Sequence, residues 1–225
     1  MRRRTRARAG QSNIYSESKF SNWAPYDPQR SEMNRSDAAR PAAVFPTHDG
    51  EAVQLHALPL HKDFVRPFDC TDVIEILKLI PQKMLCGLTS IALLGGAKRQ
   101  AKIANSGLWS YGRYRLTRIY LCAYPRSQMQ WTTRHFSFPS ARLAYLRAGV
   151  KVTHKSGQWH LAFTEQSLRR FYLWDVLIHE IGHHVDRFHR DQSTSRAERF
   201  AEWFARTYGF ESETYRRITS TRAFH

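Results

Sequence analysis

The stretch VLIHEIGHHVDRFHR, residues 176–190, places four histidines and two acids in an otherwise apolar run. Large apolar side chains recur here at intervals of four, three, four and three residues: Trp174, Ile178, Ile181, Val185 and Phe188. This spacing predicts a single apolar stripe along an α-helix. At about 100° per residue, His179 and His183 project together from nearly the opposite side. The sequence therefore predicts a core-facing helix that presents two imidazoles one turn apart.

His179, Glu180 and His183 form the pattern HExxH. Two imidazoles one turn apart can bind a single ion at Zn–N distances of about 2.0–2.1 Å. Glu180 lies close enough to the same ion to act as general base toward a metal-activated water and then as proton donor to a leaving amine. A polar helix face could produce the same pattern. The apolar flanks favour a buried site, because buried His and Glu side chains need partners.

An HExxH zinc site needs a third protein ligand and an open position for water. Downstream, SRAERFAEWFARTYG (195–209) predicts a second amphipathic helix with Glu198 and Glu202 one turn apart. Glu198 is our candidate ligand. Ser195 and Glu198 also match a capping box, in which this carboxylate would fold back onto the start of its own helix. Spacing alone leaves open whether Glu198 or Glu202 binds the metal.

HEIGHHVD followed by ERFAEWFA resembles the paired motifs of gluzincin-type zinc metallopeptidases, in particular the catalytic domain of anthrax lethal-factor-like proteins. The resemblance covers residues 178–207. It implies a bound Zn²⁺ and a division of roles: metal ligands His179, His183 and Glu198, general base Glu180, and supporting carboxylates Glu202 and Asp186. The activity that it implies is the hydrolysis of peptide bonds with narrow specificity.

The same resemblance implies an α+β, zincin-like fold, in which a small twisted β-sheet packs on the HExxH helix and a glutamate-bearing helix follows. In such folds an edge strand pairs with an extended substrate. The hairpin at 149–163 is the nearest candidate, although any strand upstream could serve. The tyrosine that lethal-factor-like domains carry shortly before the ligand helix is absent from DQSTSRA. Tyr172, Tyr208, or a His or Arg from elsewhere is then left to stabilise an oxyanion.

Residues 1–55 are rich in Arg, Ser, Pro and Asn, with few aliphatic side chains and no sustained period. They predict a flexible basic tail, followed by one zincin-like domain at 56–225. The expected elements of the domain are a helix from Thr71 or Asp72 to Pro81, a buried strand in 87–96, a longer strand in 111–125 and a hairpin around 155–158.

The formal net charge of +16 is concentrated in one part of the chain. Residues 76–164 contain no Asp or Glu but fourteen Lys and Arg. Such a positive field favours anionic partners, either an acidic protein or peptide substrate or a nucleic acid. Because aromatic and basic residues interleave in LWSYGRYRLTRIY, the alternative function is a nucleic-acid-binding protein with a structural or degenerate HExxH site. No recognised nucleic-acid fold signature accompanies this pattern.

The sequence has no apolar run of about 18 or more residues, so we expect no membrane span. The N-terminus lacks the apolar core of a secretory signal, and acids, which transit peptides avoid, follow soon after its arginines. The three cysteines, Cys70, Cys86 and Cys122, are too widely spaced to indicate a disulfide framework or a thiolate zinc site. We therefore expect a cytoplasmic protein.

Overall fold

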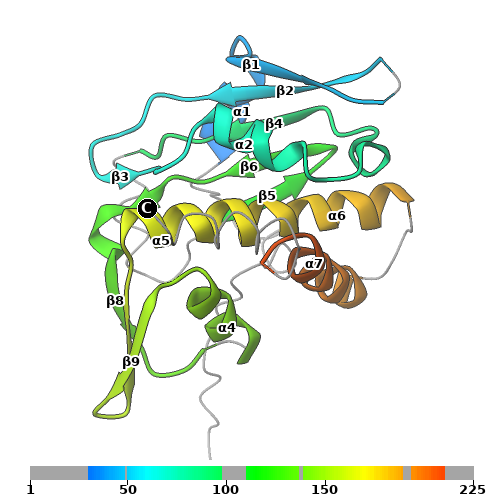
Figure 1. Cartoon of the computed structure of the whole chain (residues 1–225). Coiled ribbons are helices and arrows are strands. Elements are labelled where there is room, and N and C mark those ends of the chain that lie inside the picture. The colour runs from blue at the N-terminus through cyan, green and yellow to red at the C-terminus, as the bar shows by residue number, and fades with distance from the viewer. Residues whose placement is uncertain (1–29, 49, 98–109, 137–138, 190–193, 211–225) are drawn as a thin grey trace, which may run out of the picture.

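The largest sheet contains five strands in the spatial order β1-β2-β4-β6-β5 (Figure 1). Their bounds are β1 (Ala43–Pro46), β2 (Ala52–Ala57), β4 (Ser90–Leu93), β5 (Gly112–Arg115) and β6 (Arg118–Leu121). The three central strands, β2, β4 and β6, run parallel to one another. The two outer strands, β1 and β5, run antiparallel to their neighbours. Within the described part of the chain, β5 is therefore an antiparallel edge strand.

The computed structural model describes residues 30–48, 50–97, 110–136, 139–189 and 194–210. In these residues a long helix crosses below the five-stranded sheet, and a further helix and a small sheet lie below that helix (Figure 1). The fold is thus α+β, as the sequence predicts. None of the described helices is long and apolar enough to cross a membrane.

Both faces of the five-stranded sheet are covered. One face contributes alternate strand residues to the main core: Val53, Leu55, Ile91, Leu93, Ile119 and Leu121. Helix α2 (Cys70–Leu77) and the long helix pack against this face. On the other face, Ala92 and Tyr120 pack against Met33 of α1 (Arg30–Ala38). Burial on both sides is usual where the central strands are parallel.

The long helical segment consists of three consecutive parts. These are α5 (Glu165–Phe171), the π-helical turn η3 (Tyr172–Val176) and α6 (Leu177–His189). Thr164 caps the start, because its side chain accepts a hydrogen bond from the backbone N–H of Ser167. The predicted apolar stripe is confirmed at Trp174, Ile178, Ile181 and Val185, and the side chain of Phe188 lies outside the described part. Residues 171–186 are all buried, so this part of the helical segment is enclosed, whereas Glu165 and Arg187 near its two ends are exposed.

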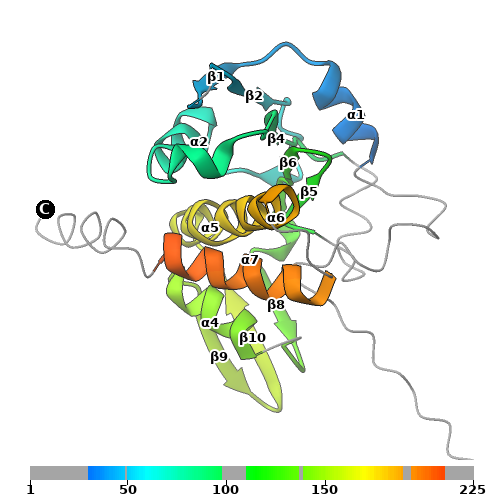
Figure 2. The same ribbon diagram turned by 90° about the vertical axis from the view of Figure 1, so that its right-hand side faces the viewer.

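Helix α7 (Thr194–Tyr208) packs directly below α6, with α4 and the smaller sheet beneath it (Figure 2). The contact is close at Gly182, where a Cβ atom would lie only 2.8 Å from the Cα of Ala201 and 3.1 Å from the Cβ of Phe204. A glycine inside the HEIGH stretch predicts that another element can approach this flank of the helix closely. The structure confirms this prediction, and the element is α7.

The smaller sheet has three antiparallel strands in the order β8-β10-β9. Its bounds are β8 (Gln130–Thr133), β9 (Lys151–Lys155) and β10 (Gln158–Ala162), and α4 (Pro139–Arg147) packs beside β9. The hairpin predicted around 155–158 is confirmed. Ser156 and Gly157 both have positive φ, which is the geometry of a two-residue turn between twisted strands.

The longer strand predicted in 111–125 is wrong. The chain reverses at Leu116 and Thr117, so that β5 and β6 form a hairpin, and a separate short strand, β7 (Tyr124–Pro125), follows. Both turn residues have positive φ, at 46° and 68°. Leu and Thr rarely adopt this conformation. Neither residue signals a turn, and the alternating pattern continues through them.

Residues 30–55 also differ from the flexible tail that composition predicts. Strands β1 and β2 belong to the five-stranded sheet, and Phe45, Val53 and Leu55 are buried in the main core. A few apolar side chains are enough to order this segment, because β4 pairs with its backbone and the main core provides apolar side chains for Phe45, Val53 and Leu55 to pack against. The rest of the predicted tail, residues 1–29, lies outside the described residues.

The remaining elements connect these layers. They are β3 (Phe64–Val65), which pairs with β7, and two 3₁₀ turns, η1 (Gln82–Leu85) and η2 (Arg126–Gln128). Helix α2 begins earlier than the sequence suggests, because Asp69 caps it and Asp72 completes a capping box. The buried strand predicted in 87–96 is confirmed as β4.

Substituting Gly182→Ala should destabilise the protein by about 1–3 kcal/mol, because the new methyl group meets the α7 backbone. Helix propensity alone predicts the opposite sign, since Ala is favoured over Gly by about 1 kcal/mol inside a helix. Denaturant unfolding of both proteins measures the difference. A variant that is as stable as the wild type would show that α6 and α7 do not need this close approach.

Candidate metal centre

Three side chains from two helices converge beneath the main sheet. Helix α6 contributes His179 and His183, whose Nε2 atoms are 3.0 Å apart. Helix α7 contributes Glu198, with one carboxylate oxygen 3.6 Å from the Nε2 atom of His179 and the other 3.7 Å from that of His183. All three ligand atoms lie within 4.8 Å of one another, so this group could hold a metal ion.

The separations suit a single small ion. Four ligand atoms in a tetrahedron, each about 2.0–2.1 Å from the ion, lie about 3.3–3.4 Å from one another. The three distances measured in this cluster, 3.0, 3.6 and 3.7 Å, lie on either side of that value. Two imidazoles and one carboxylate match the donor types of catalytic zinc sites with an open fourth position. Imidazole also suits copper, iron and nickel, so the donor set alone does not name the metal.

Burial sets the protonation of the two histidines. It lowers the pKa of His179 to about 3, and together with the nearby His179 it lowers that of His183 to about 3. Only a neutral imidazole can bind a metal. Both rings are therefore neutral, and able to act as ligands, near pH 7.

Burial has the opposite effect on Glu198, whose pKa is raised, because a buried carboxylate is harder to ionise. His183 partly offsets this rise, and the neighbouring Glu202 adds to it. A cation at the cluster would favour the ionised carboxylate. A positive ion held by the three side chains would therefore offset the cost of burying an ionised Glu198.

The structure brings Glu198 to the histidines. Its two oxygens point to the imidazoles of α6, and Ser195 lies inside the first turn of α7. Glu198 is therefore not positioned as the partner of a Ser195 cap. Glu202, one turn further along α7, is half-buried and is not part of the group of three. The liganding role of Glu198 and the supporting role of Glu202 stay predictions.

Glu180 lies between the helix and the edge strand. Its side chain is buried, and a Cβ atom at Gly112 would lie 2.7 Å from its Oε1 atom and 2.8 Å from Cγ1 of Val176. Only a glycine at this position lets β5 run so close to the HExxH segment. Sequence reasoning missed Gly112, whose only signal is a glycine at the start of an otherwise bulky strand.

The strand beside Glu180 is therefore β5. The hairpin at 149–163 belongs to the separate three-stranded sheet. His184 also links α6 to this edge, because its Nδ1 lies 3.2 Å from the hydroxyl of Tyr114 and its Nε2 lies 2.9 Å from the carbonyl oxygen of Cys86. His184 is fully buried, so these two contacts satisfy its ring inside the core.

Three further residues are candidates for supporting roles at the site: Tyr172 and Tyr208 as oxyanion donors, and Asp186 as a supporting carboxylate. Tyr172 donates its hydroxyl hydrogen to the carbonyl oxygen of Cys122 at 2.6 Å inside the core, which argues against it as an oxyanion donor. Tyr208 packs against Phe204, with ring centroids 4.4 Å apart. Asp186 is buried near the end of α6, and its predicted supporting role stays untested.

The metal-free protein should lose stability as the pH falls below 6.5, the ordinary pKa of histidine. The unfolded chain binds protons on both histidines there, whereas the folded protein does so only near pH 3. The free energy of unfolding should fall by at most about 1.4 kcal/mol per pH unit for each histidine. Glu198, whose pKa is raised, acts in the opposite direction and reduces the slope.

Denaturant unfolding between pH 7.5 and 4.5 measures this dependence. A double variant with His179→Gln and His183→Gln keeps two neutral polar side chains, so it should show a shallower loss of stability as the pH falls. Equal slopes for the two proteins would contradict the assignment of this pH dependence to the buried histidines.

Comparisons with known proteins identify no relative of this chain. No protein-family model matches the chain, and neither a curated protein nor a solved structure does. The structure shows an α+β fold with a group of two histidines and one glutamate that fits an HExxH-plus-Glu arrangement and could hold a metal ion.

Proposed function

We propose that the chain is a zinc-dependent metallopeptidase of the gluzincin type, with narrow specificity. The observation that carries this proposal is the convergence of His179, His183 and Glu198 at the helix whose buried Glu180 packs against the edge strand β5. Each feature alone has ordinary explanations. Together they bring a metal-ligand set, an acid–base residue and a strand edge to one place, which is what peptide hydrolysis at a metal requires.

In this proposal, His179, His183 and Glu198 hold the ion. A zinc ion held there would supply a water molecule of lowered pKa and would polarise the scissile carbonyl. Glu180 would accept a proton from water and return it to the leaving amine. Its buried position against β5 shields this proton transfer from bulk solvent and fixes the carboxylate beside the strand.

The substrate is proposed to bind as an added strand on β5. This strand ends the five-stranded sheet within the described residues and runs antiparallel to β6. An extended peptide on its open side would obtain main-chain hydrogen bonds from a sheet edge, and its scissile bond would lie beside Glu180. The arrangement of a mixed sheet, an HExxH helix and a following glutamate helix supports the zincin-like and lethal-factor-like resemblance.

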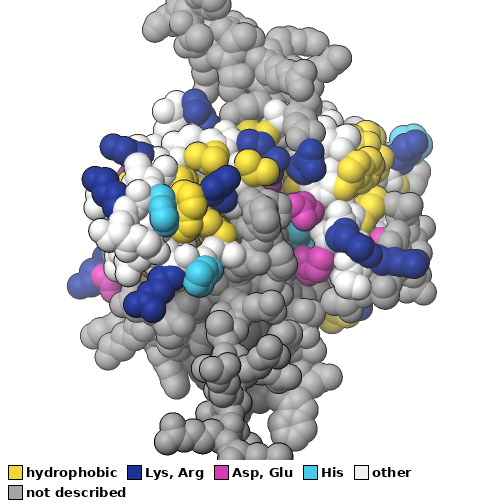
Figure 3. Space-filling model, turned by 90° about the horizontal axis from the view of Figure 1, so that it is seen from below, with side chains coloured by type: hydrophobic (Ala, Val, Ile, Leu, Met, Phe, Trp, Pro, Cys, Tyr) yellow, Lys and Arg dark blue, Asp and Glu magenta, His cyan; other side chains and the backbone are white. Residues whose placement is uncertain are grey.

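The nucleic-acid alternative and the cytoplasmic location stay predictions. The basic side chains of residues 76–164 come from separate elements, for example Lys78 after α2, Arg126 in η2 and Lys155 in β9. Seen from below, Lys and Arg side chains are scattered among hydrophobic ones (Figure 3). The described Lys and Arg side chains therefore form no single basic track for a nucleic-acid backbone in that view.

Purified protein should bind about one zinc ion per chain and cleave peptides. Glu180→Gln should keep the metal and lower kcat by about 10²–10⁴, because it removes only the acid–base group. Glu198→Ala should lose the metal, because it removes a ligand. Metal analysis and peptide-end mass spectrometry measure both.

Glu202→Ala is the matched control, one turn away on the same helix. It should keep the zinc, with at most a moderate loss of affinity. Retained zinc in Glu198→Ala together with lost zinc in Glu202→Ala would mean that the wrong carboxylate is assigned. A wild-type chain that binds no zinc would overturn the proposed function.

Gly112→Ala should lower peptidase activity far more than zinc content. The added methyl group displaces the Glu180 carboxylate or moves β5, whereas the metal ligands lie on α6 and α7. The free energy of unfolding of Gly112→Ala, compared with that of the wild type, shows whether the substitution damages β5 as a whole. A fully active Gly112→Ala enzyme would show that Glu180 does not work in the position seen here.

A further inference from the structure

We propose that β5 selects extended acidic peptides, in which two Asp or Glu side chains stand two residues apart and pair with Arg113 and Arg115. This inference rests on the proposed function, because it names the substrate class of the same edge. Sequence charge predicts only a general preference for anionic partners. The strand geometry makes that preference specific to spacing.

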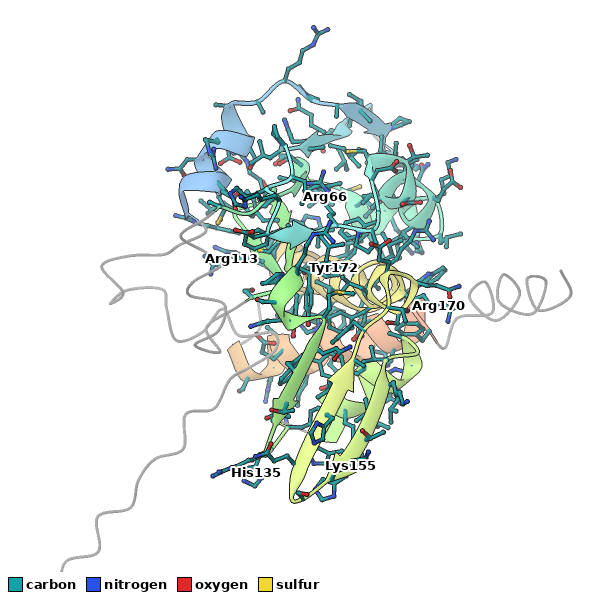
Figure 4. The ribbon with its side chains drawn as sticks, turned by 90° about the vertical axis from the view of Figure 1, so that its left-hand side faces the viewer. Arg66, Arg113, His135, Lys155, Arg170 and Tyr172 are labelled. Atoms are coloured by element: carbon teal, nitrogen blue, oxygen red, sulfur yellow. The ribbon has the colours of Figure 1, made fainter. Side chains whose placement is uncertain are left out.

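The side chains of β5 alternate between two faces of the sheet. Gly112 and Tyr114 face α6, since Gly112 lies against Glu180 and the Tyr114 hydroxyl reaches His184. Arg113 and Arg115 therefore face the opposite side, toward α1. The contact of an Arg113 guanidinium nitrogen with the sulfur of Met33 at 3.9 Å agrees with this assignment, and Figure 4 shows Arg113 beside α1.

The same face carries a third arginine on the neighbouring strand. Arg118 of β6 lies directly opposite Arg115 in the strand register. Asp37 of α1 neutralises Arg118, with an oxygen 2.7 Å from its guanidinium, and accepts a further hydrogen bond from Tyr120. Like charges opposite one another on two strands are unfavourable unless a counter-charge is near. Asp37 supplies it for Arg118.

Arg115 has no such counter-charge among the described residues. Its side chain is exposed, and it forms no ion pair with a described carboxylate. Arg113, half-buried, is steadied by its contact with α1 at one end of the strand. Arg113 and Arg115 therefore place two guanidinium groups on the face of β5 that points away from α6, and that of Arg115 is exposed.

A peptide strand added to β5 brings its own alternating side chains to both faces. Side chains at positions i and i+2 of the peptide point to the arginine face, and those between them point toward α6. Acidic residues at i and i+2 then lie opposite or diagonal to Arg113 and Arg115, within reach of these long side chains. Acidic residues at i and i+1 place only one charge there and direct the other toward Glu180 and Glu198.

The expected preference is moderate and depends on salt. Exposed ion pairs between strands contribute about 1.5- to fivefold in affinity each, and the effect weakens at high ionic strength. General attraction by a chain of net charge +16 would favour both peptides equally. The spacing of the acids, at constant composition, separates the two effects.

Binding to the zinc-loaded Glu180→Gln variant tests the proposal without requiring turnover. The probes are two fluorescent peptides of equal composition, with Asp at i and i+2 or at i and i+1, followed by fluorescence anisotropy at low and high salt. The first should bind about two- to fivefold more tightly than the second. Arg113→Glu with Arg115→Glu should remove that difference and favour a peptide with Lys at i and i+2.

Lys151→Glu with Lys155→Glu is the matched control, because it reverses the same number of charges on β9 of the other sheet, where Lys155 lies at the far tip of the hairpin (Figure 4). It should preserve the spacing preference. Equal affinity for the two Asp peptides, or a preference that survives the double Arg substitution, would overturn the inference. If the protein cleaves peptides without any preference for acidic residues, the inference is also overturned, but the proposed peptidase function is kept. Spacing-dependent binding in a chain that cleaves nothing would retain the acidic strand site and remove the peptidase.

Discussion

The distance between α6 and α7 controls the candidate metal centre. Two imidazoles lie on one helix and the carboxylate on the other, so the group of three exists only if the helices come close. Gly182 and Ala201 allow this approach, because neither places a large side chain between the two backbones. A bound ion would in turn join the two helices, which couples metal binding to the stability of this helix pair.

Features within one element could be predicted from the sequence. The helix that carries His179 and His183, the helix that carries Glu198 and the turn at Ser156 and Gly157 each follow from local spacing or turn chemistry. The third ligand required more than spacing, because Glu198 and Glu202 are equivalent by period. The paired motif favoured Glu198, and the structure brings that carboxylate to the histidines.

Features that depend on distant parts of the chain could not be predicted in this way. Leu116 and Thr117 form a turn because β6 pairs antiparallel with β5, although neither residue favours positive φ. Phe45, Val53 and Leu55 are buried because β4 and α2 provide a surface for them. Gly112 is constrained by Glu180, which lies far along the sequence, so its role appears only when strand and helix are seen together.

The HExxH helix is buried, and this burial affects the energy of its polar side chains. A helix that buries His179, Glu180, His183, His184 and Asp186 takes many polar groups out of water, which is costly unless each is compensated. His184 is compensated by Tyr114 and by the Cys86 carbonyl group. The imidazoles of the two candidate ligands are neutral, so they cannot balance the charge of an ionised Glu198. A bound cation would balance it, and such conflicts between burial and polarity are typical of functional sites.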